Sequence, residues 1–417
     1  MTLLTWVRDW LRNHRYYTWI LLLALVLRSL WGIAVPVIPL ADSYAYDVFA
    51  QNLVNCQNYG WTCHEPSAYW PVGTSFIYSL FYHVFGHSYW PIIIFHILVA
   101  LITIGLTIGL AEGWFGRQVA ALAGIFMAIW PSQVQMTTIL ASEPIFNALV
   151  MAVLVIWLNN HWNLWARSAI GGMLLAAACY LRPTALLIPI LLLFSRYVST
   201  QQIKRSLIST GIMLTLMGLL IAPWSLRNYQ AFGKFVLIST NGGANFWMGN
   251  NPESTGAAML LPSDTNEMNE AERDHYLNEK AKAYIKEKPM LFIKKFFKRI
   301  FDTHSRESIS VVWNEDGLIS RYGKSILMPL KLLNLMYWLF MLALGLLGVC
   351  VLITQSGFLS TIAHPSVLLW FYYVIVHAVT VSQDRYHFPS IPMIAILAGF
   401  STFFLIKQFG NRFHRSE

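Results

Sequence analysis

The sequence predicts an all-α polytopic membrane protein, a helical bundle with one large loop outside the membrane. Of its 417 residues, 56% are hydrophobic and only 12% are charged, against about 25% charged in an ordinary soluble protein. A soluble protein of this size could not bury so much apolar surface, so most of it must face lipid. The formal net charge of +9 comes mainly from basic residues beside apolar stretches, where anionic lipid head groups lie.

The apolar stretches predict about ten transmembrane helices, several of them shorter than the ~20 residues needed to cross a bilayer of normal thickness. Many Trp and Tyr residues stand at their ends, as in interfacial belts. The first stretch is long enough to span and lacks a small-residue cleavage site, so we interpret it as a retained helix and not as a signal peptide. The stretches are residues 17–35, 90–111, 118–133, 144–158, 168–181, 184–195, 206–222, 330–353, 365–382 and 389–407.

Three further segments are predicted to be helices outside the membrane core. Residues 71–86 form a short apolar segment that opens on a proline, which favours a helix in or re-entering the outer interface. Residues 267–288 are polar throughout and predict a helix in the outer loop. Residues 290–301 have one apolar and one basic face, a pattern suited to the membrane surface.

The placement of Lys and Arg predicts that both termini are cytoplasmic. Loop 36–89 contains no Lys or Arg, so the positive-inside rule places it outside, and loop 223–329 then lies outside as well. This divides the chain into an N-terminal transmembrane catalytic module (1–222), an extracytoplasmic loop with amphipathic helices (223–329) and C-terminal transmembrane helices (330–417). The basic residues assigned to the cytoplasm are Arg8, Arg12, Arg15, Arg117, Arg167, Arg196, Lys204, Arg205, Lys407, Arg412 and Arg415.

Two of the four cysteines, Cys56 and Cys63, share the first outer loop. A disulfide and two free thiols are both compatible with this placement, and the sequence does not decide between them. Cys179 and Cys350 lie inside apolar stretches, where cysteine is an ordinary small hydrophobic residue.

Two carboxylates stand where predicted helices begin on the outer side. Asp42, Tyr46 and Phe49 recur at helical spacing, so Asp42 is interpreted either as an N-cap or as a catalytic group, and the cap is favoured from the residues alone. Glu143, in ASEPIF, has the same two interpretations, since acid and proline are both typical of a first helical turn.

Three arginines are predicted at the same outer face. Arg182 lies between two apolar stretches, and a charge at membrane depth costs about 2.5–3.5 kcal/mol on insertion scales. Arg227 and Arg385 occur beside aromatic residues, with Tyr386 next to the latter. Guanidinium groups bind phosphate oxygens in a bidentate manner, so the three together suit a lipid-linked phosphate.

The segment STNGGANFWMGNNPESTG is rich in Gly and Asn. It lacks the GK[ST] of a phosphate-binding Walker loop, and its amides, beginning with Asn241, are interpreted as hydrogen-bonding groups for a polar ligand such as a sugar. The sequence also lacks HExxH, nucleophile-elbow and CxxC motifs, which removes support for hydrolase and redox classes.

These segments form an ordered set, listed here along the chain: ADSYAYDVFAQNL, YWPVGTSFIYSLFYHVFG, ASEPIF, LRPTALLIP, PWSLRNYQAFGKFVLISTNGGANFWMGNNP, AYIKEKPMLF and DRYHFPSIP. In this order, over most of its length, the chain resembles the C-type glycosyltransferase superfamily. The similarity is to the branch that holds dolichyl-phosphate-mannose protein mannosyltransferases and aminoarabinose transferases of lipid A. It implies a GT-C-like helix bundle with interfacial helices.

The resemblance also implies roles for the residues singled out above. Asp42 matches the first-loop acid of the family, which acts on the acceptor hydroxyl, with a second carboxylate from Asp47 or Glu65. Arg182, Arg227 and Arg385 fall in basic landmarks and would hold the donor phosphate. The sequence identifies no cofactor and no metal requirement, and His64, Asp42 and Glu65 leave a divalent metal site open beside the favoured interpretation of a solvated polar loop.

The predicted function is transfer of a sugar from a polyprenyl-phosphate donor to a lipid, glycan or protein acceptor at the outer face of the membrane. The alternatives are a polymerase or ligase of lipid-linked glycans and a membrane transporter or flippase. Transporters tend to place charge near the bilayer midplane in two matching halves, whereas here the charges gather at one face. Similarity to bacterial members predicts a bacterial inner membrane.

Overall fold

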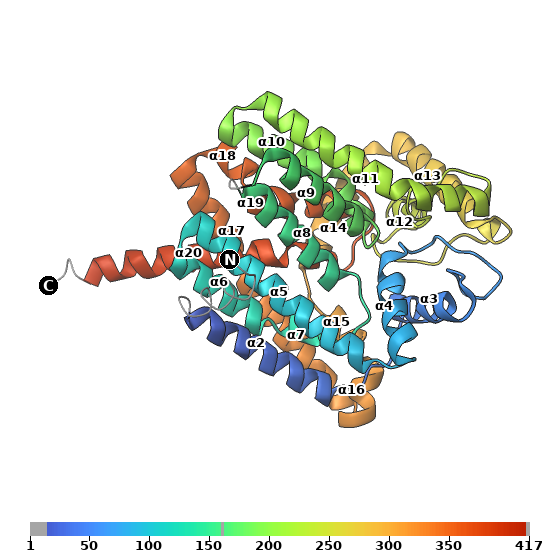
Figure 1. Ribbon diagram of the computed structural model, residues 1–417, viewed down its shortest axis with the longest axis horizontal. Coiled ribbons are helices and arrows are strands. Elements are labelled where there is room, and N and C mark those ends of the chain that lie inside the picture. Colours follow the sequence, from blue (N-terminus) through green and yellow to red (C-terminus); the bar gives the residue numbers. More distant parts are fainter. Residues whose placement is uncertain (1–14, 160–161, 414–417) are drawn as a thin grey trace.

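The computed structural model describes residues 15–159 and 162–413, which form an all-helical bundle (Figure 1). Arg8, Arg12 and Arg415, used above to predict orientation, lie outside the described residues. The helices in chain order are α2 (Arg15–Ala34), α3 (Asp42–Cys56), α4 (Gly73–Phe85), α5 (Trp90–Phe115), α6 (Arg117–Ile129), α7 (Pro131–Gln135), η1 (Met136–Thr138), α8 (Glu143–Leu158), α9 (Leu164–Cys179), η2 (Pro183–Leu187), α10 (Ile188–Thr200), α11 (Ile203–Phe232), α12 (Gly242–Gly249), η3 (Ser263–Thr265), α13 (Glu270–Glu287), α14 (Pro289–His304), α15 (Ile309–Val312), α16 (Glu315–Tyr322), η4 (Lys324–Ile326), α17 (Leu327–Ser356), α18 (Phe358–Ala363), α19 (Pro365–Val379), η5 (Phe388–Ser390) and α20 (Ile391–Phe413).

Within the described residues, six helices are long and apolar enough to cross a membrane: α2, α5, η2 with α10, α11, η4 with α17, and η5 with α20. A bent pair, α6 with α7 and η1, qualifies as a seventh, and α8, α9 and α19 are shorter apolar helices. Every predicted apolar stretch coincides with one of these helices. The prediction of an all-α membrane bundle is confirmed.

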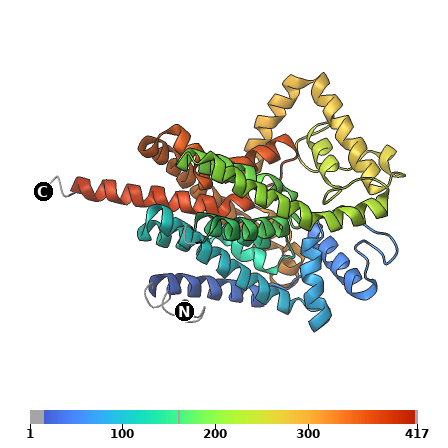
Figure 2. The same ribbon diagram turned by 45° about the horizontal axis from the view of Figure 1, so that its top comes forward.

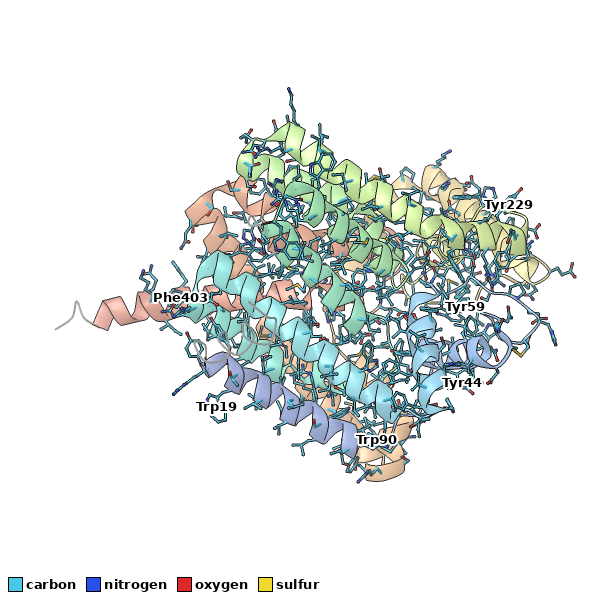
Figure 3. All side chains as sticks on the ribbon, viewed as in Figure 1. Trp19, Tyr44, Tyr59, Trp90, Tyr229 and Phe403 are labelled. Carbon is cyan, nitrogen blue, oxygen red and sulfur yellow. A yellow bond between two sulfur atoms is a disulfide. The ribbon has the colours of Figure 1, made fainter. Side chains whose placement is uncertain are left out.

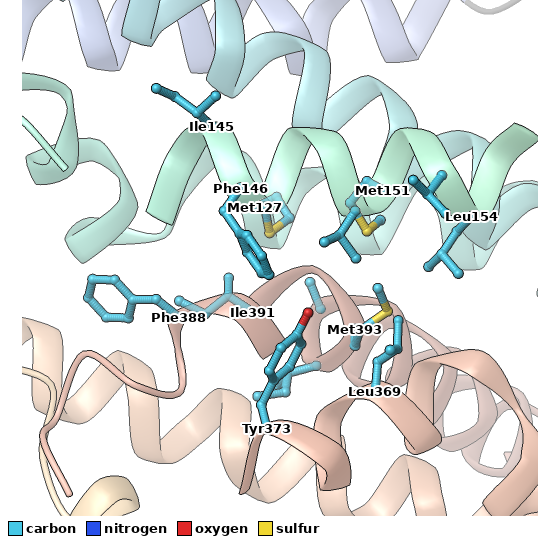
Figure 4. Packing of buried hydrophobic residues seen from close by; sticks show 14 of the residues in the cluster. Met127, Ile145, Phe146, Met151, Leu154, Leu369, Tyr373, Phe388, Ile391 and Met393 are labelled. Atoms are coloured by element: carbon cyan, nitrogen blue, oxygen red, sulfur yellow. The ribbon is translucent and has the colours of Figure 1, made fainter. Parts of the chain in front are cut away.

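Helix α20 forms the centre of the bundle. Its residues from Met393 to Ala398 are at most 1% exposed, as expected for a helix that is apolar on every side. Ile391 and Met393 face Phe146 of α8 and Tyr373 of α19 in Figure 4. The loop that precedes α20 is thereby held between α8 and α19, and this loop carries Arg385.

The break between α6 and α7, a bend of 53°, follows from Pro131. Proline has no N–H to donate to the carbonyl four residues earlier, which is that of Met127. Arg28, a buried residue of α2, donates to this carbonyl (3.2 Å) and to that of Ala128 (3.0 Å). A charged side chain in the first span therefore serves as a structural partner of the broken helix.

Both ends of the described chain, at Arg15 and Phe413, lie at one end of the bundle in Figures 1 and 2. Helices α3, α4, α12 and α13 lie at the opposite end, here called the α3 end. Helix α4 runs across the long helices, and α13 and α14 meet in a V that projects from the bundle (Figure 2). The predictions of helices at 71–86, 267–288 and 290–301 are confirmed as α4, α13 and α14.

Aromatic side chains occur at both ends of the bundle. Figure 3 labels Trp19 towards the end with the chain termini, and Tyr44, Trp90 and Tyr229 towards the α3 end. All four are more than half exposed, from 53% to 71%. Exposed aromatic rings near the two ends of a bundle are typical of the two membrane–water interfaces.

The first loop is constrained by an internal disulfide and by a close contact with the bundle. Cys56 and Cys63 form a disulfide, which decides the question that the sequence left open. Gly73, at the start of α4, packs so closely on Tyr180 that a Cβ would lie 2.6 Å from the Tyr180 carbonyl oxygen. This close approach sets the first loop beside Arg182.

Candidate active site

A cavity of about 450 Å³ lies at the α3 end, between α3, η2, α12 and the segment that follows α19. Charged, amide, aromatic and aliphatic side chains line it together. The structure brings six of the predicted site residues to this cavity, namely Asp42, Tyr46, Arg182, Asn241, Arg385 and Tyr386. They come from four separate parts of the chain, so the cavity depends on the packing of distant segments.

Four charged side chains form a continuous row beside the cavity. Arg385 Nη2 lies 2.6 Å from Asp42 Oδ2, and its Nη1 lies 3.7 Å from Glu143 Oε1. Arg182 Nη1 lies 2.7 Å from the same Glu143 oxygen. Glu143, whose side chain is 3% exposed, therefore sits between two guanidinium groups, and the row runs Asp42, Arg385, Glu143, Arg182.

Local structure explains how each carboxylate reaches this row. Asp42 is the first residue of α3 and Glu143 the first residue of α8, where the positive end of the helix dipole favours an anion. The Asp42 side chain does not cap its helix, so the N-cap interpretation favoured from sequence is wrong. The Glu143 helix does begin as predicted, with Pro144 in its first turn.

Arg385 is held in one orientation by its neighbours. Its Nε donates to Gln383 Oε1 (2.8 Å), and its guanidinium lies 4.5 Å from the centre of the Trp313 ring. Burial lowers the pKa of Arg385, but the carboxylates of Asp42 and Glu143 outweigh this effect and raise the pKa well above its usual value. Arg385 is thus a permanent cation at the cavity wall.

Tyrosine hydroxyls add neutral hydrogen-bonding groups to the lining. Burial, together with the nearby Asp42 carboxylate, raises the pKa of Tyr69 to about 12. Burial also raises the pKa of Tyr386, against the opposing effect of Arg385 and Arg182. Both phenols therefore stay protonated at neutral pH and can donate to a ligand.

The amide side of the cavity is α12, with Asn241 at its start and Asn245 one turn later. Gly249 ends this helix against α19, where a Cβ would overlap the carbonyl of Thr380. Arg299 strengthens the junction by donating to the carbonyls of Ala378 (2.6 Å) and Gly249 (2.5 Å). These contacts hold the two amides opposite the arginines.

The structure does not bring Arg227 to the cavity lining. Its Nη1 donates to the Ser67 carbonyl (2.8 Å), and Glu270 accepts from the Ser67 hydroxyl and from the Ala68 N–H (2.7 Å each). Arg227 and Glu270 together fasten the first loop to α11 and α13. In this structure Arg227 acts on the site only through that loop.

Glu65 is also placed apart from the cavity lining, in the exposed stretch 61–66 of the first loop. His64 lies beside it, whereas the Asp42 carboxylate contacts Arg385. No group of three or more His, Cys, Asp or Glu side chains in the described part of the chain could hold a metal ion. The three residues considered for a divalent cation therefore do not fit one, and no step is assigned to a metal.

Asp47, the other candidate for a second carboxylate, points away from the row. It accepts hydrogen bonds from Gln51 (3.0 Å) and from the hydroxyls of Tyr82 (2.5 Å) and Tyr89 (3.1 Å). These contacts fasten α3 to α4 and α5. The second carboxylate of the row is instead Glu143, which contacts Arg182 and Arg385 but is not part of the cavity lining.

Sequence reasoning missed several residues of the cavity, above all Tyr69 and His377. His377 lies inside the apolar stretch 365–382, and its ring stacks on that of Tyr386 with centroids 4.0 Å apart and planes 13° apart. A histidine inside a predicted span was the available signal, because ionisable residues in spans are rare and usually functional.

Comparison with known proteins gives a family match over part of the chain. Residues 70–226 match the model of the dolichyl-phosphate-mannose-protein mannosyltransferase family. These residues include Glu143 and Arg182, and they end one residue before Arg227. No relative was found among curated protein sequences.

Solved structures share the fold at low sequence identity. ArnT from Cupriavidus metallidurans bound to undecaprenyl phosphate matches with a TM-score of 0.56 and 15% identity, over 92% of this chain and 60% of that one. The archaeal oligosaccharyltransferase AglB from Archaeoglobus fulgidus, in complex with an inhibitory peptide and a dolichol-phosphate, matches with a TM-score of 0.55 and 10% identity, over 98% and 52%. The Archaeoglobus fulgidus enzyme in complex with Zn and sulfate matches with a TM-score of 0.56 and 12% identity, over 94% and 50%.

This chain therefore spans about half to three fifths of the length of the solved proteins that it matches. The fold agreement extends over almost the entire chain, although the family match covers only residues 70–226. The resemblance of this chain to the C-type glycosyltransferases, predicted from its sequence, is confirmed.

Proposed function

We propose that this protein is a membrane glycosyltransferase that moves a sugar from a polyprenyl-phosphate donor to a lipid, glycan or protein acceptor. The observation that carries the proposal is the row of Asp42, Arg385, Glu143 and Arg182 at one cavity. Displacement of a phosphate from a sugar requires a base for the acceptor hydroxyl and cations for the departing phosphate. The row supplies both within one site.

In the proposed reaction the acceptor oxygen forms a bond to the anomeric carbon as the bond from that carbon to the phosphate oxygen breaks. The hydroxyl proton passes to the Asp42 carboxylate, and the electron pair of the broken bond stays on the polyprenyl phosphate. Arg385 and Arg182 stabilise the charge that develops on this phosphate. Atoms and charges balance without a further reactant.

The ion pairs imply an order of events. Asp42 Oδ2 lies 2.6 Å from Arg385 Nη2, so the oxygen that would accept the proton of the acceptor hydroxyl already accepts a guanidinium N–H. A donor phosphate that binds Arg385 competes with Asp42 for the same N–H groups. We infer that donor binding releases Asp42 for the acceptor, so the base is active only when a donor is present.

Neutral groups on the other wall would hold the sugar. Asn241 and Asn245 offer amides, and Tyr69 offers a protonated phenol, all at the lining of the same cavity. Sugar hydroxyls both donate and accept hydrogen bonds, as amides and phenols do. Tyr46, one turn after Asp42 on α3, lies where it can orient the acceptor beside the base.

We propose that the cavity opens on the outer face of a bacterial inner membrane and that both termini are cytoplasmic. The absence of Lys and Arg from loop 36–89 supports this, and so does the position of Arg15 and Phe413 at the end away from the cavity. The three-part division 1–222, 223–329 and 330–417 is kept as a proposal, although its first boundary falls inside α11 and its second inside α17. A reporter that works only in the cytoplasm should be active after residue 417 and inactive when inserted at 61–66, and the reverse result would invert the orientation.

The proposal is tested by a transfer assay with the full chain reconstituted in lipid. Radiolabelled polyprenyl-phosphate sugars and extracted envelope acceptors are supplied, and label that moves to an acceptor is measured. Wild-type protein and Asp264→Asn, which changes an exposed ion pair with Lys280, should both transfer, whereas Asp42→Asn should not. Lipid or solute movement in sealed vesicles without transfer from any donor would overturn the enzyme and favour a transporter.

A further inference from the structure

His377 is a buried, unpartnered polar side chain at the wall of the cavity. It belongs to the last turn of α19, is 7% exposed and lines the cavity. Neither ring nitrogen has a hydrogen-bond partner among the described residues. Its ring lies parallel to that of Tyr386, with 4.0 Å between the centroids.

An imidazole without a partner is unusual in a protein interior, where most buried polar side-chain atoms are hydrogen-bonded. The other buried histidines among the described residues follow the rule. His96 contacts the Tyr78 hydroxyl and His387 contacts the Thr303 carbonyl, and the partly buried His304 contacts the Ile300 carbonyl, each within 3.0 Å. A polar group left open at a cavity indicates that a ligand supplies the missing partner.

The surroundings of His377 indicate which ligand atom this is. The Tyr386 ring on which it stacks also lies 5.9 Å from the guanidinium carbon of Arg182 and 5.5 Å from that of Arg385. One aromatic ring therefore joins the imidazole to both cations of the cavity. An imidazole N–H beside two guanidinium groups is suited to an anionic oxygen.

The aliphatic lining next to His377 is suited to a lipid chain attached to that anion. Val376, its neighbour on α19, and Leu186 of η2 both line the cavity. Leu187 and Ile190, which follow Leu186 along the chain, are 49% exposed at the bundle surface. An apolar surface thus begins beside the imidazole and continues towards the region that lipid would occupy.

We propose that His377 is a donor-binding residue whose imidazole donates a hydrogen bond to the phosphate of the lipid-linked donor. This inference rests on the proposed function and adds a third phosphate ligand to Arg182 and Arg385. Stacking on Tyr386 holds the imidazole of His377 in one plane, and this limits the directions in which its ring nitrogens can point.

Two substitutions separate hydrogen bonding from stacking. His377→Phe keeps a flat ring against Tyr386 and removes both nitrogens. His377→Asn keeps an N–H donor and removes the ring. A hydrogen-bonding role predicts that Asn retains function better than Phe, and a purely structural stacking role predicts the opposite order. His83→Phe, at an exposed position of α4, is the matched control for loss of an imidazole.

The experiment measures binding of undecaprenyl phosphate to the full chain in detergent, with undecaprenol and inorganic phosphate as comparison ligands. Wild type and His83→Phe should bind the lipid phosphate more tightly than either comparison ligand. His377→Phe should lose about tenfold or more in affinity for the lipid phosphate, as expected for one hydrogen bond to a charged group, with its affinity for undecaprenol unchanged. His377→Asn should stay within about threefold of wild type.

Wild-type affinity for the lipid phosphate in His377→Phe, with transfer also intact, would overturn the inference and leave the proposed function standing. Normal phosphate affinity in His377→Phe combined with a raised KM for the sugar donor would also overturn it, because the imidazole would then contact the sugar. Loss of binding in Asn but not in Phe would assign His377 to stacking. A wild-type protein that does not distinguish lipid phosphate from undecaprenol would overturn the inference and the proposed donor together.

Discussion

Arg385 and Asp42 form an ion pair across 343 positions of the sequence, with Nη2 and Oδ2 2.6 Å apart. The pair joins the first residue of α3 to the loop that precedes the last helix. The side chain of Asp42 is 24% exposed and that of Arg385 is 12% exposed, and both residues line the cavity. A ligand that accepts hydrogen bonds from Arg385 would compete with Asp42 for the same N–H groups.

Asp42→Asn is expected to lower the rate of transfer by about 10²–10⁴-fold, the usual contribution of a general base. The same change removes the competitor for the Arg385 N–H groups, so affinity for the donor phosphate should stay equal or rise. Transfer rate and lipid-phosphate affinity, measured on one protein preparation, check both effects. Loss of transfer through lost donor binding would contradict the release of Asp42 by phosphate.

Arg182→Met is expected to destabilise the protein by about 3–5 kcal/mol, because it leaves the Glu143 carboxylate buried with a weaker partner. The double variant Arg182→Met and Glu143→Gln should recover most of this stability, since no uncompensated charge is left. Transfer should be absent from both, because the guanidinium is missing in each. Thermal unfolding in detergent and the transfer assay together check this, and a fully stable single variant would contradict the ion pair.

Arg28→Met is expected to lower stability through the carbonyls of Met127 and Ala128, which would be left without their charged donor. Hydrogen bonds to charged groups contribute about 1.5–3 kcal/mol each. The matched control is Tyr337→Phe, which removes one neutral hydrogen bond to the Phe126 carbonyl nearby (2.8 Å) and should cost about 1 kcal/mol. Donor affinity should be unchanged in both. An equal thermal shift for the two variants would refute the assigned role of Arg28.

Asp274→Asn is expected to stabilise the protein at neutral pH. Burial raises the pKa of Asp274, against the hydrogen bond from the Gly243 N–H and the charge of His275. A carboxyl with a raised folded-state pKa favours folding when protonated, and this contribution is lost as pH rises through that pKa. The stability difference between Asn and wild type should therefore shrink as pH falls, as thermal unfolding over a pH series would measure. A stability difference between Asp274→Asn and wild type that grows as pH falls would contradict the raised pKa of Asp274.

The long helices could be predicted from the sequence because a long apolar segment in a membrane must satisfy its own backbone hydrogen bonds, as an α-helix does. The break at Pro131 was not predicted, since residues 118–133 form one uninterrupted apolar stretch. Helices α12, α15 and α16 were not predicted either. They are short, so contacts with the bundle rather than periodicity stabilise them, as Gly249 of α12 illustrates where it packs on Thr380.

The sequence predicted charged residues of the site and also Tyr46, Asn241 and Tyr386, but it did not predict which of these residues contact one another. Arg182 and Arg385 could be identified because a charged side chain near lipid is energetically costly and therefore usually has a function. Nothing in the sequence, however, indicates that Asp42 pairs with a residue 343 positions away. Arg227 met the same criterion, yet its partners are backbone carbonyls of the first loop. The sequence shows which positions carry a charge near the membrane. The packing of the folded chain determines whether that charged side chain contacts a ligand or a backbone carbonyl.

The position of Arg385 also has a consequence for biosynthesis. Because this residue lies only a few positions before α20, a ribosome must translate the chain as far as residue 385 before the cavity has its central cation. The Glu143–Arg182 pair can assemble much earlier, when α8 and η2 have entered the membrane. A chain released before residue 385 therefore holds Asp42 without its guanidinium partner and lacks a complete cavity.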